Sequence, residues 1–386
     1  MKVLVTDGQL RKSLTAVRQL GVLGHEVWVA EDTPVALARF SKWAKGALRS
    51  PPLGDPKRFS GWLQDTLIGQ RFDLVLPMDD ESTEAATLLG GRAAACALVP
   101  EADHYQWFRD KGRTIDLARS LGMDTPESRL VDTEQDLIEL LAQWPQGFIL
   151  RPRRGAGGRG VRLVKRPDEA VAAFRRWASA GGGMIAQEWI AVSAKWDVGL
   201  LYGAHGEFLA GFVQRELRWF PEPYGASTVQ VSASRPDLVA MARQLVESVG
   251  WRGPLEVEFL EAEDSGRMVL AEVNPRYWNS LAVAVAAGVD FPGLQAAAMA
   301  GHPNASPPVY RVGAGMQYTQ RKLQRSVTEM RRFLMLRPYR SRSGPDMGMS
   351  SDGGFWGSAD TSGCFRSSFM ALRSLGHDAH VVSHCD

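Results

Sequence analysis

Short apolar runs alternate with amphipathic stretches through the first hundred residues of the chain. The apolar runs lie at 2–7, 25–32 and 72–81, and the stretches with helical spacing of apolar residues lie at 12–24 and 58–69. Runs of the first kind are typical of buried strands, and stretches of the second kind are typical of helices. Strands and helices that alternate with short links favour a parallel, doubly wound sheet. We therefore expect an α/β domain over residues 1–100.

Acidic residues follow the strands of this predicted domain. They are Asp7, Asp32, Asp79 and Asp80. Parallel sheets bind ligands at the carboxyl ends of their strands, where these carboxylates would gather. Aspartate is also a favoured helix N-cap. For each residue taken singly, capping is the simpler interpretation, and the sequence leaves both open.

The pattern changes after residue 100. A helix is expected within 110–131 and another over 132–144, with Asp132 as its N-cap. The remaining apolar runs predict antiparallel strands with helices between them, including hairpins within 148–164, 195–217 and 253–281. Runs of strands flanked by helices indicate an α+β domain.

Composition narrows the class of protein. The chain has 386 residues, of which 45% are hydrophobic and 23% are charged, and its net charge is +2, as in ordinary globular proteins. This balance disfavours nucleic-acid binding, which usually needs a strongly basic face. No apolar run approaches the roughly 20 residues of a membrane-spanning helix, and residues 1–8 enter a strand pattern directly, without a signal-peptide pattern. We expect a cytoplasmic protein with no membrane partner.

Dedicated cysteine and histidine metal sites are not expected. The three cysteines, Cys96, Cys364 and Cys385, are far apart, and the seven histidines show no HExxH spacing. Residues 331–386 are rich in Gly, Ser and Arg with little periodicity, so we expect them to be irregular and poorly ordered.

Glycine and arginine crowd the loop of the hairpin over 148–164. The arginines are Arg151, Arg153, Arg154 and Arg159, and the glycines are Gly155, Gly157, Gly158 and Gly160. Glycine lets backbone N–H groups approach a ligand closely, and arginine supplies fixed positive charge. The pair suits a polyphosphate. An exposed basic hairpin without a ligand fits the same stretch equally well.

Carboxylates cluster in the last predicted hairpin. Glu258, Glu272 and Asn274 are expected at facing positions, with Glu256 and Arg276 beside them, because alternate strand residues share a face. Carboxylates gathered among apolar residues repel one another unless a cation compensates. Oxygen ligands of this kind suit Mg²⁺. The alternative, a solvated edge of the sheet, fits poorly with the apolar flanks.

Four motifs in order resemble those of the ATP-grasp superfamily, in its carboxylate–amine ligase branch. They are "LRPRRGAGGRGV", "QEWI", "LEVEF" and "LAEVNPR", within a likeness that spans roughly residues 1–310. The resemblance implies a Rossmann-like α/β pre-ATP-grasp domain followed by an α+β ATP-grasp domain whose two subdomains clamp ATP. It divides the chain into a pre-ATP-grasp domain (1–100), a small subdomain with a Gly-rich flap (101–183), a large subdomain with the metal site (184–330) and an irregular extension (331–386).

The same resemblance implies roles for individual residues. ATP phosphates would contact the flap glycines, Arg151 and Lys111, although a solvated helix charge is the alternative for Lys111. The adenine would meet Gln187, Glu188, Trp189 and Ile190, and Leu270 either packs on it or is a core leucine. Glu258, Glu272 and Asn274 would hold Mg²⁺ or Mn²⁺. Arg276 and Arg215 are the candidates for steadying the oxyanion and the acylphosphate, with a surface charge as the alternative for Arg215.

Two departures from the family pattern stand out. Arg151 occupies a position where most members have lysine, and arginine is still a donor fork for phosphate. The family often places a ribose-binding acid shortly after the adenine strand. Here Lys195 stands at that place with Asp197 as the nearest substitute, so ribose recognition is left unassigned.

The function implied is ATP-dependent ligation of a carboxylate to an amine through an acylphosphate, with release of ADP and phosphate. The partners would be two small-molecule substrates, and because many members are dimers, a homodimer is allowed. A degenerate nucleotide-binding sensor or scaffold and an ATP-grasp kinase are the alternatives.

Overall fold

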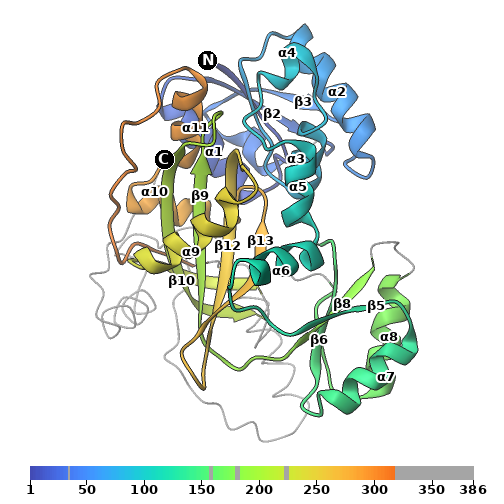
Figure 1. Ribbon diagram of the computed structural model, residues 1–386. Coiled ribbons are helices and arrows are strands. Elements are labelled where there is room, and N and C mark those ends of the chain that lie inside the picture. Colours follow the sequence, from blue (N-terminus) through green and yellow to red (C-terminus); the bar gives the residue numbers. More distant parts are fainter. Residues whose placement is uncertain (34, 156–159, 179–182, 221–225, 318–386) are drawn as a thin grey trace, which may run out of the picture.

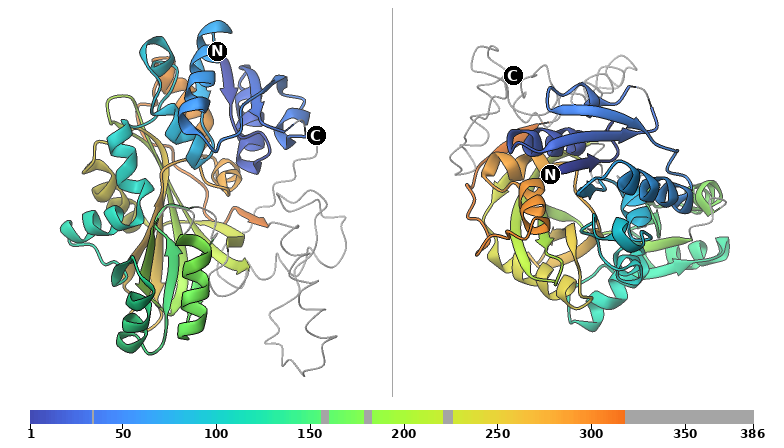
Figure 2. Two further views of the ribbon diagram at one scale, coloured as in Figure 1. Left: turned by 90° about the vertical axis from the view of Figure 1, so that its right-hand side faces the viewer. Right: turned by 90° about the horizontal axis from the view of Figure 1, so that it is seen from above.

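The computed structural model describes residues 1–33, 35–155, 160–178, 183–220 and 226–317, which form three sheets and the helices around them (Figure 1). The predicted irregular extension over 331–386 lies outside the described residues. The N-terminal sheet and the smaller of the other two sheets lie at opposite ends of the molecule, with the largest sheet between them (Figures 1 and 2).

The N-terminal sheet is parallel, as the alternating pattern predicts. Its strands are β1 (Lys2–Val5), β2 (Glu26–Glu31), β3 (Ala44–Arg49) and β4 (Leu74–Leu76), in the order β3-β2-β1-β4. The helices around it are α1 (Arg11–Val22), the short 3-10 helix η1 (Leu37–Phe40), α2 (Pro56–Gly69), α3 (Asp80–Ala86) and α4 (Gly91–Ala94). Val3 and Val5 belong to the core formed with α1, whereas Leu4 belongs to the core formed with α2. Helices therefore cover both faces, which confirms the doubly wound arrangement.

The small sheet carries the predicted Gly-rich hairpin. Its strands are β5 (Ser128–Val131), β6 (Phe148–Pro152), β7 (Arg162–Val164) and β8 (Met184–Glu188), in the order β5-β8-β6-β7. Strands β6 and β7 pair antiparallel, as expected. Helices α7 (Glu134–Gln143) and α8 (Pro167–Ala178) pack on this sheet around a separate core.

One detail of α7 differs from the sequence prediction. Its N-cap is Thr133, not Asp132, because the Thr133 side chain accepts a hydrogen bond from the backbone N–H of Asp136. The Asp136 carboxylate in turn accepts from the N–H groups of Asp132 and Thr133. This is a capping box, in which two side chains satisfy the free donors of the first turn.

The largest sheet is antiparallel. It is built from β9 (Val192–Tyr202), β10 (Phe208–Phe220), β11 (Ala226–Ala233), β12 (Gly253–Ala262), β13 (Met268–Asn274) and β14 (Gly315–Gln317), in the order β13-β12-β9-β10-β11-β14. Helices α5 (Ala102–Arg109), α6 (Lys111–Ser120) and α9 (Pro236–Glu247) contribute to the core on one face of it. Thus α5 and α6, which fall within the predicted small subdomain, pack on the large sheet. The predicted domain boundaries themselves remain predictions.

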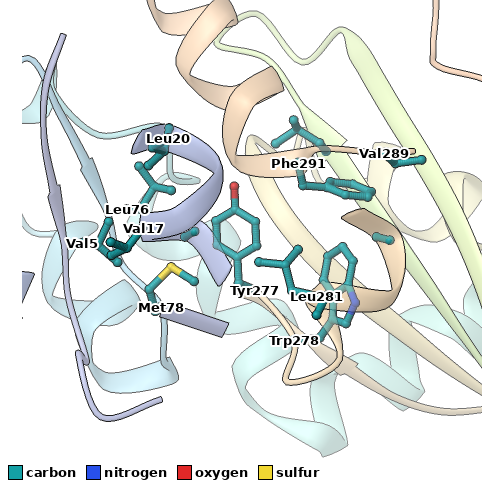
Figure 3. Close-up of a cluster of buried hydrophobic side chains, with 14 of the residues drawn as sticks. Val5, Val17, Leu20, Leu76, Met78, Tyr277, Trp278, Leu281, Val289 and Phe291 are labelled. Atoms are coloured by element: carbon teal, nitrogen blue, oxygen red, sulfur yellow. The ribbon is translucent and has the colours of Figure 1, made fainter. Parts of the chain in front are cut away.

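The other face of the large sheet shares a core with the N-terminal sheet. Helices α10 (Leu281–Ala287) and α11 (Phe291–Met299) lie beside α1 (Figure 1). One buried cluster runs from β1 and β4 to β9 and β10. Figure 3 shows Tyr277 and Trp278 within this cluster. The Tyr277 hydroxyl donates to Gln295 Oε1 at 2.6 Å, and the Trp278 ring packs edge-on against Phe291 at 4.8 Å between centroids.

Among the described helices, none alone has the length and apolar character needed to cross a membrane. Helices α10 and α11, which meet at a bend of 85°, meet that criterion only when they are taken together.

Candidate active site

The predicted acidic hairpin forms, and its register brings the predicted residues opposite one another. Glu258 on β12 pairs with Glu272 on β13, and Glu256 pairs with Asn274. Directly opposed residues of an antiparallel pair project from the same face. The Asn274 amide nitrogen donates to Glu258 Oε1 at 2.6 Å and to Glu256 Oε2 at 3.1 Å. The two sequence-distant halves of the motif therefore form one polar cluster.

Two predicted phosphate-binding cations meet this hairpin. Arg151, on β6, forms an ion pair with the Glu272 carboxylate, and Lys111 Nζ, at the start of α6, lies 3.8 Å from it. Lys111 also donates to the carbonyl of Gly155 at 2.9 Å, at the edge of the Gly-rich loop. Both cations are nearly buried. Burial, followed by the charge of Arg151, holds the pKa of Lys111 well below its usual range. Burial lowers the pKa of Arg151 to about 10.

The oxygens of this cluster fit a magnesium ion that is shared with phosphates. Glu258 and Glu272 supply two facing carboxylates and Asn274 supplies an amide. Within the described residues, no three His, Cys, Asp or Glu side chains form a complete metal site by themselves. Mg²⁺ usually takes one or two protein carboxylates and completes its shell with phosphate oxygens and water. The donor set therefore suits Mg²⁺ bound together with a nucleotide.

Arg276 joins the hairpin to the N-terminal sheet. Its guanidinium donates to Asn274 Oδ1 and to the Tyr277 carbonyl, both at 2.9 Å, and its Nε lies 3.3 Å from carboxylate oxygens of Asp79 and Asp80. Burial alone would lower the pKa of Arg276, but the neighbouring carboxylates of Asp80 and Asp79 raise it above its ordinary value. Arg276 therefore stays charged although it is only 4% exposed.

The acids at the strand ends divide between capping and charge pairing. Asp79 caps α3 in a capping box with Ser82, which is the simpler of the two interpretations. It also pairs with Arg276, as does Asp80. Asp7 accepts from the Ser82 hydroxyl and from the backbone N–H of Asp79. No cap or ligand role is visible for Asp32, whose backbone N–H donates to Glu31.

Lys12 belongs to the same interface, and sequence reasoning missed it. Its side chain is 1% exposed, and Nζ lies 3.2 Å from Asp79 Oδ1 and 3.0 Å from the Tyr277 carbonyl. Burial, and next the charge of Arg276, lower the pKa of Lys12. In the sequence it reads as an ordinary surface charge in the first turn of an amphipathic helix. Only the packing of α1 against the segment after β13 buries it.

The predicted adenine segment lies at the end of β8, beside the phosphate-binding cations. The Gln187 carbonyl oxygen of the side chain accepts from Arg151 Nη1 at 3.4 Å. The backbone N–H of Glu188 donates to the Glu127 carbonyl, and its carboxylate lies 3.5 Å from Arg267. Lys165 lies over the Trp189 ring at 5.8 Å. Ile190 follows directly, before β9 begins. This segment therefore adjoins the cluster of Arg151, Lys111 and Glu272.

Leu270 and Arg215 are not brought together with that cluster. Leu270 is 1% exposed and belongs to the core on the helix-covered face of the large sheet. Arg215 pairs with Trp196 and Val231 across β10, and its guanidinium lies over the Trp196 ring at 5.4 Å. Trp196 belongs to the same helix-covered face as Leu270. Of the flap glycines, Gly155 and Gly160 are described, whereas Gly157 and Gly158 lie outside the described residues.

Further carboxylates are buried on the face of the sheet that carries Glu258. Asp197 on β9 is directly opposite Glu258. Burial, followed by the charge of Glu258, raises the pKa of Asp197 to about 8. Burial and the charge of Asp197 raise the pKa of both Glu216 and Glu256 well above the ordinary range. Such shifts gather at functional sites, because ordinary cores avoid unpaired carboxylates.

One family model and several known proteins are similar to this chain. A family model described as "ATP-grasp in the biosynthetic pathway with Ter operon" matches residues 203–322. D-alanine–D-alanine ligase of Pseudomonas entomophila (strain L48) is 25% identical over 203 residues, which cover 50% of this chain and 63% of that protein. Pyruvate carboxylase 1 of Caenorhabditis elegans is 28% identical over 157 residues, which cover 38% of this chain and 13% of that protein. The matches thus span less than two thirds of either relative.

A solved structure of similar fold covers more of the chain. It is the biotin carboxylase domain of 2-oxoglutarate carboxylase from Hydrogenobacter thermophilus, a dimer in complex with MgADP, ADP and bicarbonate. The two folds agree with a TM-score of 0.68 at 16% sequence identity, over 83% of this chain and 76% of that one. The pre-ATP-grasp and ATP-grasp arrangement expected from the motifs is therefore confirmed as the fold. In its motifs, its fold and the family model that matches residues 203–322, this chain is similar to proteins of the ATP-grasp superfamily.

Proposed function

We propose that this chain is an ATP-dependent carboxylate–amine ligase that works through an acylphosphate and releases ADP and phosphate. One observation carries the proposal. The facing carboxylates of Glu258 and Glu272 adjoin two buried cations on other elements, Arg151 and Lys111. This is a site with both acceptors for a metal and donors for phosphate, which phosphoryl transfer needs more than it needs a covalent catalyst.

In the first step, a substrate carboxylate oxygen attacks the γ-phosphorus of ATP. The new O–P bond forms as the bond to the ADP oxygen breaks, which leaves ADP and a mixed anhydride. Lys111 and Arg151 hold the phosphates. For Glu272 to bind a metal, its ion pair with Arg151 has to open, which frees the Arg151 guanidinium for phosphate oxygens.

Glu258, Glu272 and Asn274 would hold magnesium, which would supply positive charge against the phosphates during transfer. The residues present are compatible with Mg²⁺. A role for Mn²⁺ stays a prediction.

In the second step, the amine nitrogen attacks the acyl carbon. The C–N bond forms, the amine loses a proton, and the C–O bond to phosphate breaks with its electron pair leaving on phosphate. Arg276 is the candidate for stabilising the oxyanion, because it is fixed by four protein oxygens and remains charged. We leave Arg215 out of the mechanism because it lies with Trp196 on the other face of the sheet.

The relatives support this class of reaction. A D-alanine–D-alanine ligase and a MgADP-binding carboxylase domain are among the similar proteins. The two small-molecule substrates, a homodimer and a cytoplasmic location remain predictions for this chain.

The test is phosphate release from Mg-ATP by the full chain, in the presence of pooled carboxylic acids, amino acids and amines. The proposal expects release that requires both a carboxylate and an amine. Formation of ADP with a carboxylate alone, together with a stable phosphorylated product and no release of free phosphate, would indicate a kinase. Binding of Mg-ADP without release in any pool would favour a sensor or scaffold.

A further inference from the structure

A second polar cluster lies on the large sheet beside the proposed metal site. Asp197 on β9 is directly opposite both Glu258 on β12 and Gln214 on β10. Glu216, two residues after Gln214 on β10, is directly opposite Gln230 on β11. Residues at directly opposed positions share a face. Of these five side chains, only Glu258 has a part in the proposed metal site.

Gln214 fixes one side of this cluster. Its amide nitrogen donates to Asp197 Oδ2 at 2.8 Å and to the Ser280 hydroxyl at 2.5 Å, and the residue is fully buried. Its carbonyl oxygen, Oε1, has no hydrogen-bond partner among the described residues. Because the amide nitrogen donates to both a carboxylate and a hydroxyl, the unpaired atom of this buried side chain is a hydrogen-bond acceptor.

Gln230 repeats this pattern on the neighbouring strand. It is 3% exposed, and its Oε1 likewise has no partner within the described part of the chain. A buried carbonyl oxygen without a donor costs free energy, about 1–3 kcal/mol. Two such oxygens beside two buried carboxylates form a set of acceptors that lacks donors.

The nearest lysine does not supply the missing donors. Lys195 is opposite Glu216, but its ammonium lies over the Trp219 ring, 4.7 Å from the centroid. The charge of Lys195 lowers the pKa of both Asp197 and Glu216, against the larger raising effect of burial, but no described ion pair or hydrogen bond joins it to either residue. The unpaired acceptors of this cluster therefore match a group that carries several N–H donors and positive charge.

We propose that Asp197, Glu216 and the side-chain carbonyl oxygens of Gln214 and Gln230 bind the primary ammonium group of the amine substrate. The proposal rests on the ligase function proposed above and assigns its second substrate to the class of protonated primary amines. The position of Asp197 beside the proposed metal site supports this assignment. Neighbouring strands are about 4.7–4.9 Å apart, so an amine beside Asp197 would lie one strand away from Glu258, where the acylphosphate forms.

Charge argues against an anionic ligand. An anionic second substrate would meet two carboxyl groups and two carbonyl oxygens, none of which offers it a positive charge. An ammonium group matches both the charge and the number of acceptors.

The test measures binding without turnover, so that it stands apart from the ligase assay. The unfolding midpoint of the full chain is measured in methylammonium chloride, potassium chloride and tetramethylammonium chloride at equal ionic strength. Methylammonium should raise the midpoint above that in tetramethylammonium by about 2 °C or more, because a ligand that binds only the folded state stabilises it. Asp197→Asn and Glu216→Gln should each abolish this difference, and the exposed Asp264→Asn should keep it.

Three outcomes would overturn the assignment. The first is an equal unfolding midpoint in methylammonium and tetramethylammonium. The second is a rise in potassium equal to that in methylammonium, which would indicate a metal-cation site. The third is a methylammonium-dependent rise that both Asp197→Asn and Glu216→Gln retain. Once an amine substrate is found, Asp197→Asn should also raise its KM about tenfold while the KM for ATP stays within twofold. Failure of the ligase proposal would be seen separately, as absence of Mg-ATP-dependent phosphate release from the unaltered chain.

Discussion

At the scale of single residues, the site depends on charges that are buried in opposing pairs. Glu272 faces Arg151 and Lys111, and Arg276 faces Asp79 and Asp80. A buried charge that loses its partner is strongly destabilised. These ion pairs hold the side chains in place. A ligand group that carries the same charge as one partner can take the place of that partner.

Arg151 should contribute to ATP affinity. Arg151→Ala removes a phosphate donor. We therefore expect the dissociation constant for Mg-ATP to rise by about 10- to 150-fold, since a charged hydrogen bond contributes about 1.5–3 kcal/mol. Calorimetric titration measures this change. The matched control is Arg166→Ala, a largely exposed arginine, which should bind as the unaltered chain does. Equal affinity in both variants would remove Arg151 from the phosphate site.

Glu31 should make folding stability depend on pH. Burial, followed by its hydrogen bond with Asp32, raises the pKa of Glu31 to about 7. The folded state then binds more protons than the unfolded state between the ordinary glutamate pKa of 4.5 and 7, so the free energy of unfolding should fall as pH rises through that window. In Glu31→Gln this fall should be smaller, as measured by urea unfolding at pH 5 and pH 8. An unchanged slope, equal to that of the exposed Glu263→Gln, would contradict the shift.

At the scale of elements, alternation along the chain was enough to predict the acidic hairpin and the parallel N-terminal strands. Residues two apart share a face of a strand, so Glu272 and Asn274 had to project together. Which face each strand presents depends on packing across the sheet, and so the sequence did not reveal that Arg215 lies with Trp196. The buried state of Lys12 and the capping role of Thr133 depend in the same way on tertiary contacts and on local hydrogen bonds.

Strand β9 needs a glycine where it crosses the shared core. A Cβ at Gly199 would overlap the ring of Trp278, which is itself 1% exposed and packed on Phe291. Gly199→Ala should therefore lower the free energy of unfolding by about 1–3 kcal/mol, the usual cost of overpacking a core.

The matched control for that variant is Gly61→Ala. Gly61 lies within α2, and a Cβ there would meet no other atom within 4 Å, so this substitution should leave stability equal or raise it by about 0.5–1 kcal/mol. Chemical denaturation of both variants measures the difference. A Gly199→Ala variant as stable as the control would show that Trp278 does not fill this space.

At the scale of the whole molecule, the N-terminal sheet and the large sheet share one core, whereas the small sheet has its own (Figures 1 and 3). The site is assembled where these parts meet. The small sheet supplies Arg151, the large sheet supplies Glu258 and Glu272, and the N-terminal sheet holds Arg276 through Asp79 and Asp80. The motifs in the sequence predicted the members of this site but not the contacts that join the three parts.

The central claim is that the chain makes an acylphosphate from ATP and a carboxylate. Hydroxylamine tests it most directly, because it attacks an acylphosphate to give a stable hydroxamate that mass spectrometry identifies. With Mg-ATP and pooled carboxylic acids, the account predicts a hydroxamate of at least one acid, formed in step with ADP and lost in Glu272→Gln, whose circular dichroism should be unchanged. ATP turnover without any hydroxamate, or a hydroxamate that Glu272→Gln forms at the full rate, would contradict it.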